Sequence, residues 1–173
     1  VIIVDDKSTD NTVKIVEQFI EGLLTHQLIN ASTHSGAGAA RNLGVKHAGG
    51  DILVFVDADM RFSRDFIENL TEPIQKGRTK GTFSKMEFIA NWNNIWARFW
   101  NYRRGIFEPR AVPENYPSFS PVFRAILKSE FEKVGGFDEK KGYNDDWSLS
   151  ERLRYKSMET KAMFYYNNPD SLL

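Results

Sequence analysis

Two apolar segments of this chain end abruptly in pairs of carboxylates. The first segment opens the sequence and leads into Asp5 and Asp6, and the second leads into Asp57 and Asp59. A buried strand that delivers acids at its carboxyl end is a common way for an open α/β sheet to build a polar site. Both segments are therefore predicted to be strands that carry site residues at their ends.

The spacing of Asp57 and Asp59 indicates metal chemistry. Side chains at positions i and i+2 of an extended segment point the same way, so both carboxylates can address one cation or one ligand. Hard oxygen ligands of this kind suit Mg²⁺ or Mn²⁺. The alternative for this pair is a plain acidic turn after a strand. For Asp5 and Asp6 the alternative is helix capping, because acids favour the positive end of the helix that follows.

The composition is that of one soluble globular domain. The chain has 173 residues, of which 41% are hydrophobic and 27% charged, which is enough for a sizeable core. Basic and acidic residues both number 23, and this zero net charge argues against bulk nucleic-acid binding. The absence of cysteine excludes disulfides and zinc–thiolate sites. No stretch approaches the roughly 18 apolar residues of a membrane-spanning helix.

Strand and helix patterns alternate in the first half, which predicts an α/β fold with a mostly parallel sheet flanked by helices. Strands are expected at 1–5, 28–31, 52–56, 82–88, 120–127 and 161–166, and helices at 13–23, 39–47, 65–75, 90–104, 128–134 and 146–155. The continuous apolar run at 52–56 indicates a central strand, 82–88 an edge strand, and Pro73 a possible break in its helix. The chain starts inside a strand pattern, so it is expected to be a fragment.

Four blocks in a fixed order resemble a known family. They are Val4-Asp-Asp-Lys-Ser-Thr-Asp-Asn-Thr12, Gly38-Ala-Ala-Arg-Asn-Leu-Gly44, Phe55-Val-Asp-Ala-Asp59, and Val134-Gly-Gly-Phe-Asp-Glu139 followed by Asp145-Asp-Trp-Ser-Leu149. Together they resemble glycosyltransferase family 2, whose members have the GT-A fold. The resemblance implies a partial GT-A domain, without the family's first strand and helix. Residues 1–80 would bind the nucleotide sugar, and residues 81–173 would bind the acceptor and supply the catalytic base.

The resemblance also implies roles for the first group of acids. Asp6 would contact the nucleotide base or ribose, with a lesser role for Asp5. Asp59 would be the direct ligand of Mn²⁺ or Mg²⁺, and Asp57 would contact ribose or reach the metal through water. The cation would neutralise the charge that develops on the leaving diphosphate. Arg41 would either reach that diphosphate or orient an Asp, or simply belong to a helix packed closely on the sheet.

A later acidic pair would supply the catalytic base. Asp146 matches the family's base, which deprotonates the acceptor hydroxyl, and Asp145 stands where Glu is usual. Helix capping is the alternative for this pair. Trp147 would line the acceptor site or simply pack. No histidine follows His47, so the late histidine ligand of many GT-A enzymes is absent or replaced, and the three histidines are expected to be solvated or packed.

The segment 92–107 has an unusual pattern. Aromatic and aliphatic residues share one wide arc of its helical wheel, and arginines and asparagines fill the opposite side. The arc predicts either an amphipathic helix packed on the sheet or, because tryptophans and arginines interleave, a peripheral membrane contact.

The function expected from the resemblance is metal-dependent, inverting transfer of a sugar from a UDP or GDP sugar to a hydroxyl or lipid-linked acceptor. The location would be the cytoplasm, either free or at the cytoplasmic face of a membrane. Two alternatives stay open: a nucleotidyltransferase of similar α/β fold, and a non-catalytic domain that binds a sugar nucleotide.

Overall fold

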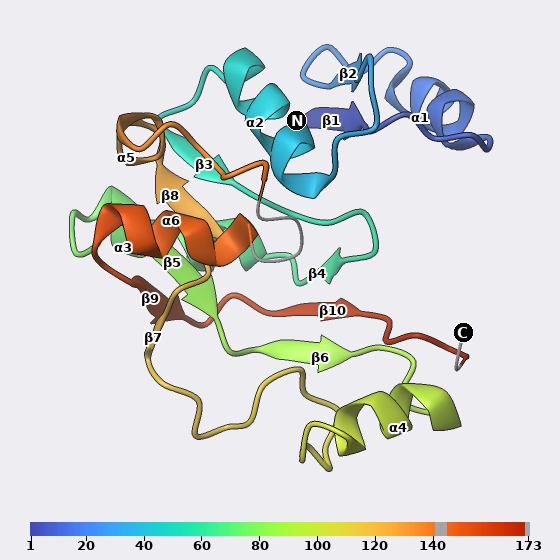
Figure 1. The fold of residues 1–173 in the computed structure, drawn as a ribbon, viewed down its shortest axis with the longest axis vertical. Helices are drawn as coiled ribbons and strands as arrows, with labels where there is room; N and C mark the ends of the chain where they lie inside the picture. Colours follow the sequence, from blue (N-terminus) through green and yellow to red (C-terminus); the bar gives the residue numbers. More distant parts are fainter. Residues whose placement is uncertain (141–144, 172–173) are drawn as a thin grey trace.

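The computed structural model describes residues 1–140 and 145–171, and for Asp145 and Asp146 it describes the backbone only. Within these residues the strands form three sheets, of five, three and two strands, with helices on the outside (Figure 1). Among the described helices, none has both the length and the apolar character that crossing a bilayer requires.

The five-stranded sheet forms the centre of the molecule and has the strand order β3-β8-β5-β9-β7. Its strands are β3 (Ile52–Val54), β8 (Ala125–Leu127), β5 (Gly81–Ser84), β9 (Ser157–Thr160) and β7 (Phe119–Ser120). The β5 and β9 strands run parallel, and the other three pairings in this sheet are antiparallel. All four residues of the middle strand β5 are buried.

Two smaller sheets lie beside the central sheet (Figure 1). In one, β1 (Ile2–Asp5) pairs in parallel with β2 (Gln27–Asn30). In the other, β10 (Phe164–Tyr166) lies between β4 (Arg61–Phe62) and β6 (Glu87–Ile89), antiparallel to the first and parallel to the second. Figure 1 shows β6 and β10 extending from the central sheet toward α4.

The helices of the described residues are α1 (Thr12–Ile20), α2 (Ala37–His47), α3 (Phe66–Gln75), α4 (Ile95–Tyr102), α5 (Lys128–Lys133) and α6 (Asp145–Leu153). Of these, α2, α5 and α6 cover one face of the central sheet and α3 covers the other, while α1 and α4 lie away from it (Figure 1). Leu53 and Phe55 pack in one buried cluster with residues of α2, α5 and α6. Ile52 and Val54, which point to the opposite face because side chains alternate along a strand, pack against the cluster that contains α3. Each large side chain buried in this way contributes about 1.5–3 kcal/mol to folding.

The α/β fold with flanking helices is confirmed, but several details of the sheet differ from the expectation. The sheets are mixed rather than mostly parallel, because four of the pairings between described strands are antiparallel and three parallel. The expected strand at 82–88 is two strands, and its first part, β5, is central rather than at an edge. The expected strand at 120–127 is likewise divided into β7 and β8.

The position of β3 also differs from the expectation, since this strand lies at the edge of its sheet and not in the middle. The residues of this strand are all apolar because helices cover both faces of the sheet at β3. Such a run does not indicate whether the strand has a neighbouring strand on each side. In α3, the expected break at Pro73 does not occur. The proline lies in the last turn, where it removes a single backbone hydrogen bond from a helix that ends two residues later.

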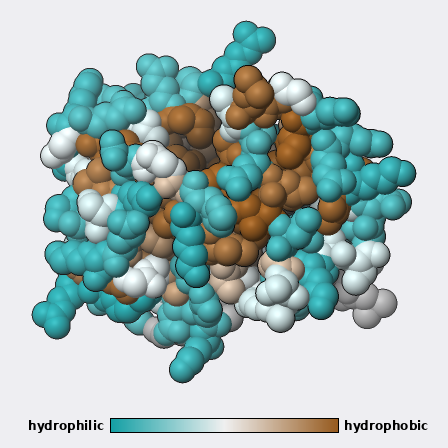
Figure 2. Space-filling view, turned by 90° about the horizontal axis from the view of Figure 1, so that it is seen from above, coloured by the Kyte–Doolittle hydropathy of each residue, from teal (hydrophilic) through white to brown (hydrophobic). Residues whose placement is uncertain are grey.

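Among the described strands, β1 pairs only with β2, and β3 only with β8. A cavity of about 680 Å³ lies between β1 and β3 and is lined by apolar side chains of both strands, by small residues of α2, and by the polar residues Asp6, His34, Arg41 and Asp57. Figure 2, which views the molecule from the side of α2 and β2, shows apolar side chains gathered across the middle of this face.

Candidate active site

A second cavity, of about 590 Å³, lies where the end of β3 and the start of α2 meet the strands β6 and β10. Its polar lining residues are Ser35, Arg41, Asp57, Asp59, Glu87, Arg124, Asp138, Glu139 and Tyr166, together with Gly36, Ala37, Gly38, Met60 and Phe164. The fold therefore brings together three of the predicted site residues, Arg41, Asp57 and Asp59, and joins them to residues from the second half of the chain.

Asp57 is held between two arginines. The Nη2 atom of Arg41 lies 2.7 Å from one carboxylate oxygen, and the Nη1 atom of Arg124 lies 3.2 Å from the other. Burial raises the pKa of Asp57, but the hydrogen bond from Arg41 and the charge of Arg124 outweigh burial and hold the pKa below its usual value. Asp57 is therefore ionised at neutral pH, and both of its oxygens already face cations.

Arg124 is a site residue that the motifs do not reveal. Its guanidinium lies over the ring of Phe164, 5.3 Å from the centroid, and its side chain is only 16% exposed. Its Nε atom is buried and has no hydrogen-bond partner among the described residues. A buried donor without a partner costs about 1–3 kcal/mol. One sequence signal could have found Arg124: it is a lone charge in the apolar run 122–127.

Asp59 is more exposed than Asp57 and does not pair with the arginines that hold Asp57. It lines the cavity and is exposed, and no hydrogen bond or ion pair joins its carboxylate to the described residues. The described lining holds five carboxylates and two guanidinium groups, so its net charge is −3 when all are ionised. No group of three His, Cys, Asp or Glu that could hold a metal ion is found among the described residues. The hard carboxylate oxygens do fit a divalent cation that takes its other ligands from substrate and water.

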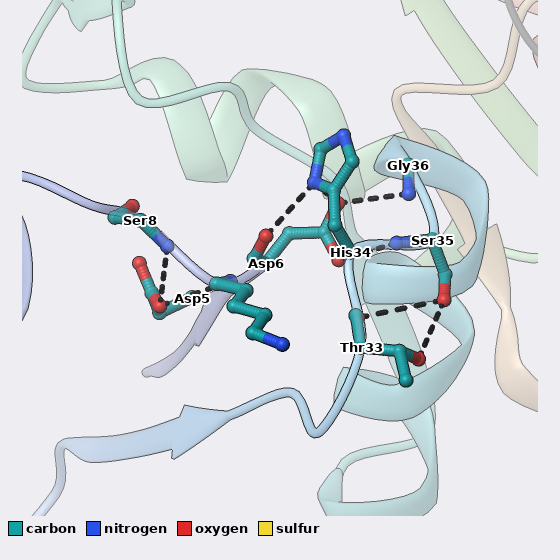
Figure 3. Close-up of polar contacts among 8 residues, drawn as sticks. Asp5, Asp6, Ser8, Thr33, His34, Ser35 and Gly36 are labelled. Carbon is teal, nitrogen blue, oxygen red and sulfur yellow. Dashed lines mark hydrogen bonds and ion pairs between the residues drawn. The ribbon is translucent and has the colours of Figure 1, made fainter.

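Asp6 holds the loop that leads into α2 (Figure 3). Its two carboxylate oxygens accept hydrogen bonds from the backbone N–H groups of Ser35, at 2.9 Å, and Gly36, at 2.8 Å. The Nδ1 atom of His34 lies 2.9 Å from the same carboxylate. Asp6 therefore shapes the first turn of α2, which lines the cavity. His34 is 78% exposed, in keeping with the expectation of a solvated histidine, and it also contacts Asp6.

Asp5 lies away from this cavity and anchors a turn. Its Oδ2 atom accepts hydrogen bonds from the backbone N–H groups of Lys7 and Ser8, at 3.1 and 3.0 Å (Figure 3). The hydrogen bonds from Ser8 and Lys7 hold the pKa of Asp5 below its usual value. This role is similar to the helix-capping alternative, because the carboxylate accepts hydrogen bonds from backbone N–H groups that follow β1. A nucleotide contact by Asp5 stays a prediction.

Asn42 connects α2 to the segment that carries Asp138 and Glu139. Its Nδ2 atom donates to the backbone carbonyl of Phe137 and to the Glu139 carboxylate, and its Oδ1 atom accepts from the backbone N–H of Phe137. A Cβ on Gly136, whose φ is +80°, would lie 2.5 Å from that Oδ1 atom. A glycine is therefore required where this segment approaches α2. Asn42 lies in the second of the four sequence blocks, but no site role was predicted for it.

Glu87 of β6 and Tyr166 of β10 also line the cavity. Burial, together with the negative charge of Glu87, raises the pKa of Tyr166. Neither residue was predicted, because no motif marks them and the pairing of β6 with β10 joins segments about 80 residues apart.

The predicted acceptor and base residues have different outcomes. Trp147 is 56% exposed and is not among the residues that line the cavity, so its acceptor role stays a prediction. The side chains of Asp145 and Asp146 lie outside the described part of the chain. The described backbone places both residues in the first turn of α6.

Comparisons with known proteins agree on one family. The family model described as glycosyl transferase family 2 matches residues 1–135. The chain is 38% identical over 68 residues to an uncharacterized glycosyltransferase of Haemophilus influenzae, a match that covers 39% of this chain and 25% of that protein. It is 25% identical over 183 residues to the glycosyltransferase GlyG of Streptococcus pneumoniae, covering 97% of this chain and 58% of that protein. The chain thus spans less than two thirds of these relatives.

Solved structures share the fold. Residues 1–349 of Staphylococcus aureus TarS, in complex with UDP-GlcNAc, match 98% of this chain and 50% of that chain, with a TM-score of 0.70 and 19% identity. The mannosyltransferase PcManGT of Pyrobaculum calidifontis, in complex with GDP-Man and Mn²⁺, matches 99% of this chain and 48% of that chain, with a TM-score of 0.70 and 21% identity. Since the family model covers most of the sequence, this chain belongs to glycosyl transferase family 2 and has the GT-A fold.

Proposed function

We propose that this domain transfers a sugar from a UDP or GDP sugar to a hydroxyl acceptor, with inversion at the anomeric carbon. The observation that carries the proposal is the cluster at the end of β3, where Asp57 is held by Arg41 and Arg124 and the adjacent Asp59 faces the cavity. The relatives support the donor class, because TarS was solved with UDP-GlcNAc and PcManGT with GDP-Man.

The charges of the cavity support a requirement for a divalent cation. A diphosphate adds negative charge to a lining that already has a net charge of −3, so a cation must compensate for it. Asp59 is the carboxylate that would hold Mn²⁺ or Mg²⁺, since the oxygens of Asp57 contact arginines. The ion would supply charge neutralisation at the leaving diphosphate. The presence of Mn²⁺ in the PcManGT complex is consistent with this assignment.

The arginines and the start of α2 would then position the donor. Arg41 and Arg124 present guanidinium groups toward the cavity, and such groups bind phosphate oxygens well. The first turn of α2, fixed by Asp6, adds the positive end of a helix dipole. The buried, unpartnered Nε of Arg124 is a cost that favours a role in the site over one in stability alone.

Asp146 would act as the catalytic base, in line with the family resemblance. It would take the proton of the acceptor hydroxyl as that oxygen attacks the anomeric carbon. The bond between that carbon and the diphosphate oxygen breaks at the same time, and the nucleoside diphosphate leaves with the electron pair. Attack from the face opposite the leaving group inverts the anomeric configuration.

The test is transfer by the full-length protein and by its Asp146→Asn variant, with the anomeric configuration of the product determined by NMR. We expect an inverted product from the wild type. The variant should lose transfer but keep donor binding, because the base contacts only the acceptor. Asp51→Asn, a change to an exposed aspartate away from the cavity, is the matched control. Full activity of Asp146→Asn, or a product with retained configuration, would disprove the mechanism. Donor binding without transfer by the wild type would favour a non-catalytic binding domain.

A further inference from the structure

Helix α4 packs against the protein through a face that carries both an alanine and a polar asparagine. The residues of α4 that are fully buried are Ala97 and Asn101. Ile95 is 65% exposed, Phe99 40% and Tyr102 44%. These three residues recur at positions i, i+4 and i+7, so they form one continuous stripe along the helix. The outer part of the apolar arc is therefore exposed to solvent, and only the remainder of the arc packs against the protein.

Hydrogen bonds fix the helix in this orientation. The Asn101 side chain donates to the backbone carbonyls of Glu108, at 3.1 Å, and Arg110, at 2.7 Å. Its oxygen accepts a hydrogen bond from Asn168, which also donates to the carbonyl of Ala97. Asn101 is thus buried with its polar atoms satisfied. Turning the aromatic stripe inward would break all of these bonds, each of which contributes about 1 kcal/mol.

The exposed stripe continues beyond the end of α4. Phe107 is 75% exposed, and its ring lies 5.3 Å from that of Tyr102. We call the four residues Ile95, Phe99, Tyr102 and Phe107 the outer stripe. Figure 1 shows α4 at the periphery of the molecule, away from the central sheet, so the described part of the chain leaves the outer stripe open.

The charges beside the outer stripe are mostly positive, since the only acidic residue within 92–110 is Glu108, which follows Phe107 and pairs with Arg110. Residues 92–107 contain three arginines and no acidic residue, in a chain whose net charge is zero. Arg103 is exposed and lies over the ring of Trp100, 5.3 Å from the centroid. Exposed aromatic and aliphatic side chains flanked by arginines, with tryptophans on the same helix, are typical of helices that lie in a membrane interface with anionic lipids.

We propose that the outer stripe docks on the surface of a lipid bilayer that contains anionic headgroups. Helix α1 provides the contrast within the same chain. Its Ile15 and Phe19 are 62% and 70% exposed, but its charges, Lys14 and Glu17, are of opposite sign. A surface of this kind offers apolar contact without electrostatic attraction to anionic lipid.

The outer stripe is connected to the wall of the candidate active site. Glu87 of β6 lines the cavity, and Ile89, two residues further along the same strand, packs against Ala97 of α4. Tyr166 lines the cavity and also packs on this cluster. A bilayer bound at the outer stripe would therefore lie across α4 from the part of the cavity lined by Glu87 and Tyr166. If the proposed glycosyl transfer is correct, this position indicates a lipid-linked hydroxyl as the acceptor.

The test is sedimentation of the full-length protein with vesicles of phosphatidylcholine alone, or of phosphatidylcholine mixed with phosphatidylglycerol. We expect stronger binding to the anionic vesicles and weaker binding as salt is raised. Phe99→Ser combined with Phe107→Ser should lower the partition coefficient at least about tenfold, because two exposed aromatic groups no longer enter the interface. The matched double variant Ile15→Ser/Phe19→Ser, on α1, should bind like the wild type. Both variants change exposed residues, and thermal unfolding checks that they fold.

Three results would overturn the proposal. One is equal vesicle binding by the wild type and the Phe99/Phe107 variant. Another is the absence of binding to anionic vesicles. A third is a dimer or protein complex that the same variant dissociates, since the occupant of the stripe would then be a polypeptide. Vesicle binding does not require catalysis, so its outcome is independent of the proposed function. The acceptor class is tested separately: a vesicle-embedded acceptor should be glycosylated more slowly by the Phe99/Phe107 variant, with donor hydrolysis unchanged.

Discussion

The two acidic strand ends of this domain look alike in sequence, but the structure uses them differently. After β1, the carboxylates of Asp5 and Asp6 accept hydrogen bonds from backbone N–H groups and fix two turns. After β3, the carboxylate of Asp57 faces two arginines, and that of Asp59 faces the cavity. The acidic pattern in the sequence therefore does not show which carboxylates shape loops and which can take part in chemistry. That difference depends on the groups that the fold places beside each carboxylate.

Removing the charge of Asp59 is expected to have the largest effect on the difference between the two strand ends. Because we assign the cation to this carboxylate, Asp59→Asn should lower kcat/KM for transfer by about 10²- to 10³-fold. Asp5→Asn should change kcat/KM far less, because that carboxylate serves a turn outside the cavity. Steady-state kinetics over a range of Mn²⁺ concentrations measure both. Similar losses in the two variants would mean that the strand ends do not differ as described.

A second prediction concerns the arginine that the motifs did not reveal. Arg124→Gln removes one of the two cations beside Asp57 and should lower kcat about 10- to 100-fold, with a smaller change in the affinity for Mn²⁺. Arg78→Gln is the control, because this exposed arginine pairs with Glu72 on the surface. An Arg124 variant with wild-type kcat would show that Arg124 only supports the structure around Asp57.

A third prediction separates the loop role of Asp6 from a direct nucleotide contact. Asp6→Asn weakens the hydrogen bonds to Ser35 and Gly36 and should lower the free energy of unfolding by about 1–2 kcal/mol. Asp10→Asn, at an exposed position that accepts one hydrogen bond from Thr12, should cost less than about 0.5 kcal/mol. Urea unfolding measures both. Unchanged stability of Asp6→Asn, together with lost nucleotide binding, would instead favour the direct contact.

The smallest expected effect is on the pH dependence of stability. The pKa values of Asp5 and Asp57 lie below the ordinary value of 3.8. A lowered pKa in the folded state stabilises the protein above the ordinary value, and the contribution is lost as pH falls through the folded-state value. Stability should therefore decrease as pH falls below about 5. Because Asp57 is 41% exposed, its own share is less than about 1 kcal/mol. Urea titrations at pH 7 and 3 should show a smaller decrease for Asp57→Asn than for the wild type.

Local patterns were sufficient for much of the fold and for part of the site. Apolar runs and the turn residues between them located β1, α2 and α5 to within about two residues, and the motif spacing identified Asp57 and Asp59. These signals are local, because a strand that ends in carboxylates is visible within ten residues. The acidic pair at 145–146 was found by the same kind of signal, and its role stays a prediction.

The features that were missed depend on contacts between distant segments. Arg124 reaches Asp57 across 67 residues, and Asn42 reaches Phe137 across 95. The position of β3 at the edge of its sheet also could not be predicted. An apolar run indicates that both faces of a strand are covered, but it does not indicate how many strands pair with it. For α4, the periodicity revealed an apolar arc, but the buried hydrogen bonds of Asn101 decide which side faces inward.

The role that we propose for the cavity beside Asp57 and Asp59 is the binding of a nucleotide diphosphate sugar together with a divalent cation. This role can be measured by calorimetric titration of the full-length protein with UDP and GDP sugars, with and without Mn²⁺. We expect binding of one nucleotide class that requires Mn²⁺ and is abolished by Asp59→Asn but not by Asp51→Asn. Binding that is equally strong without the cation, or that survives in Asp59→Asn, would contradict it.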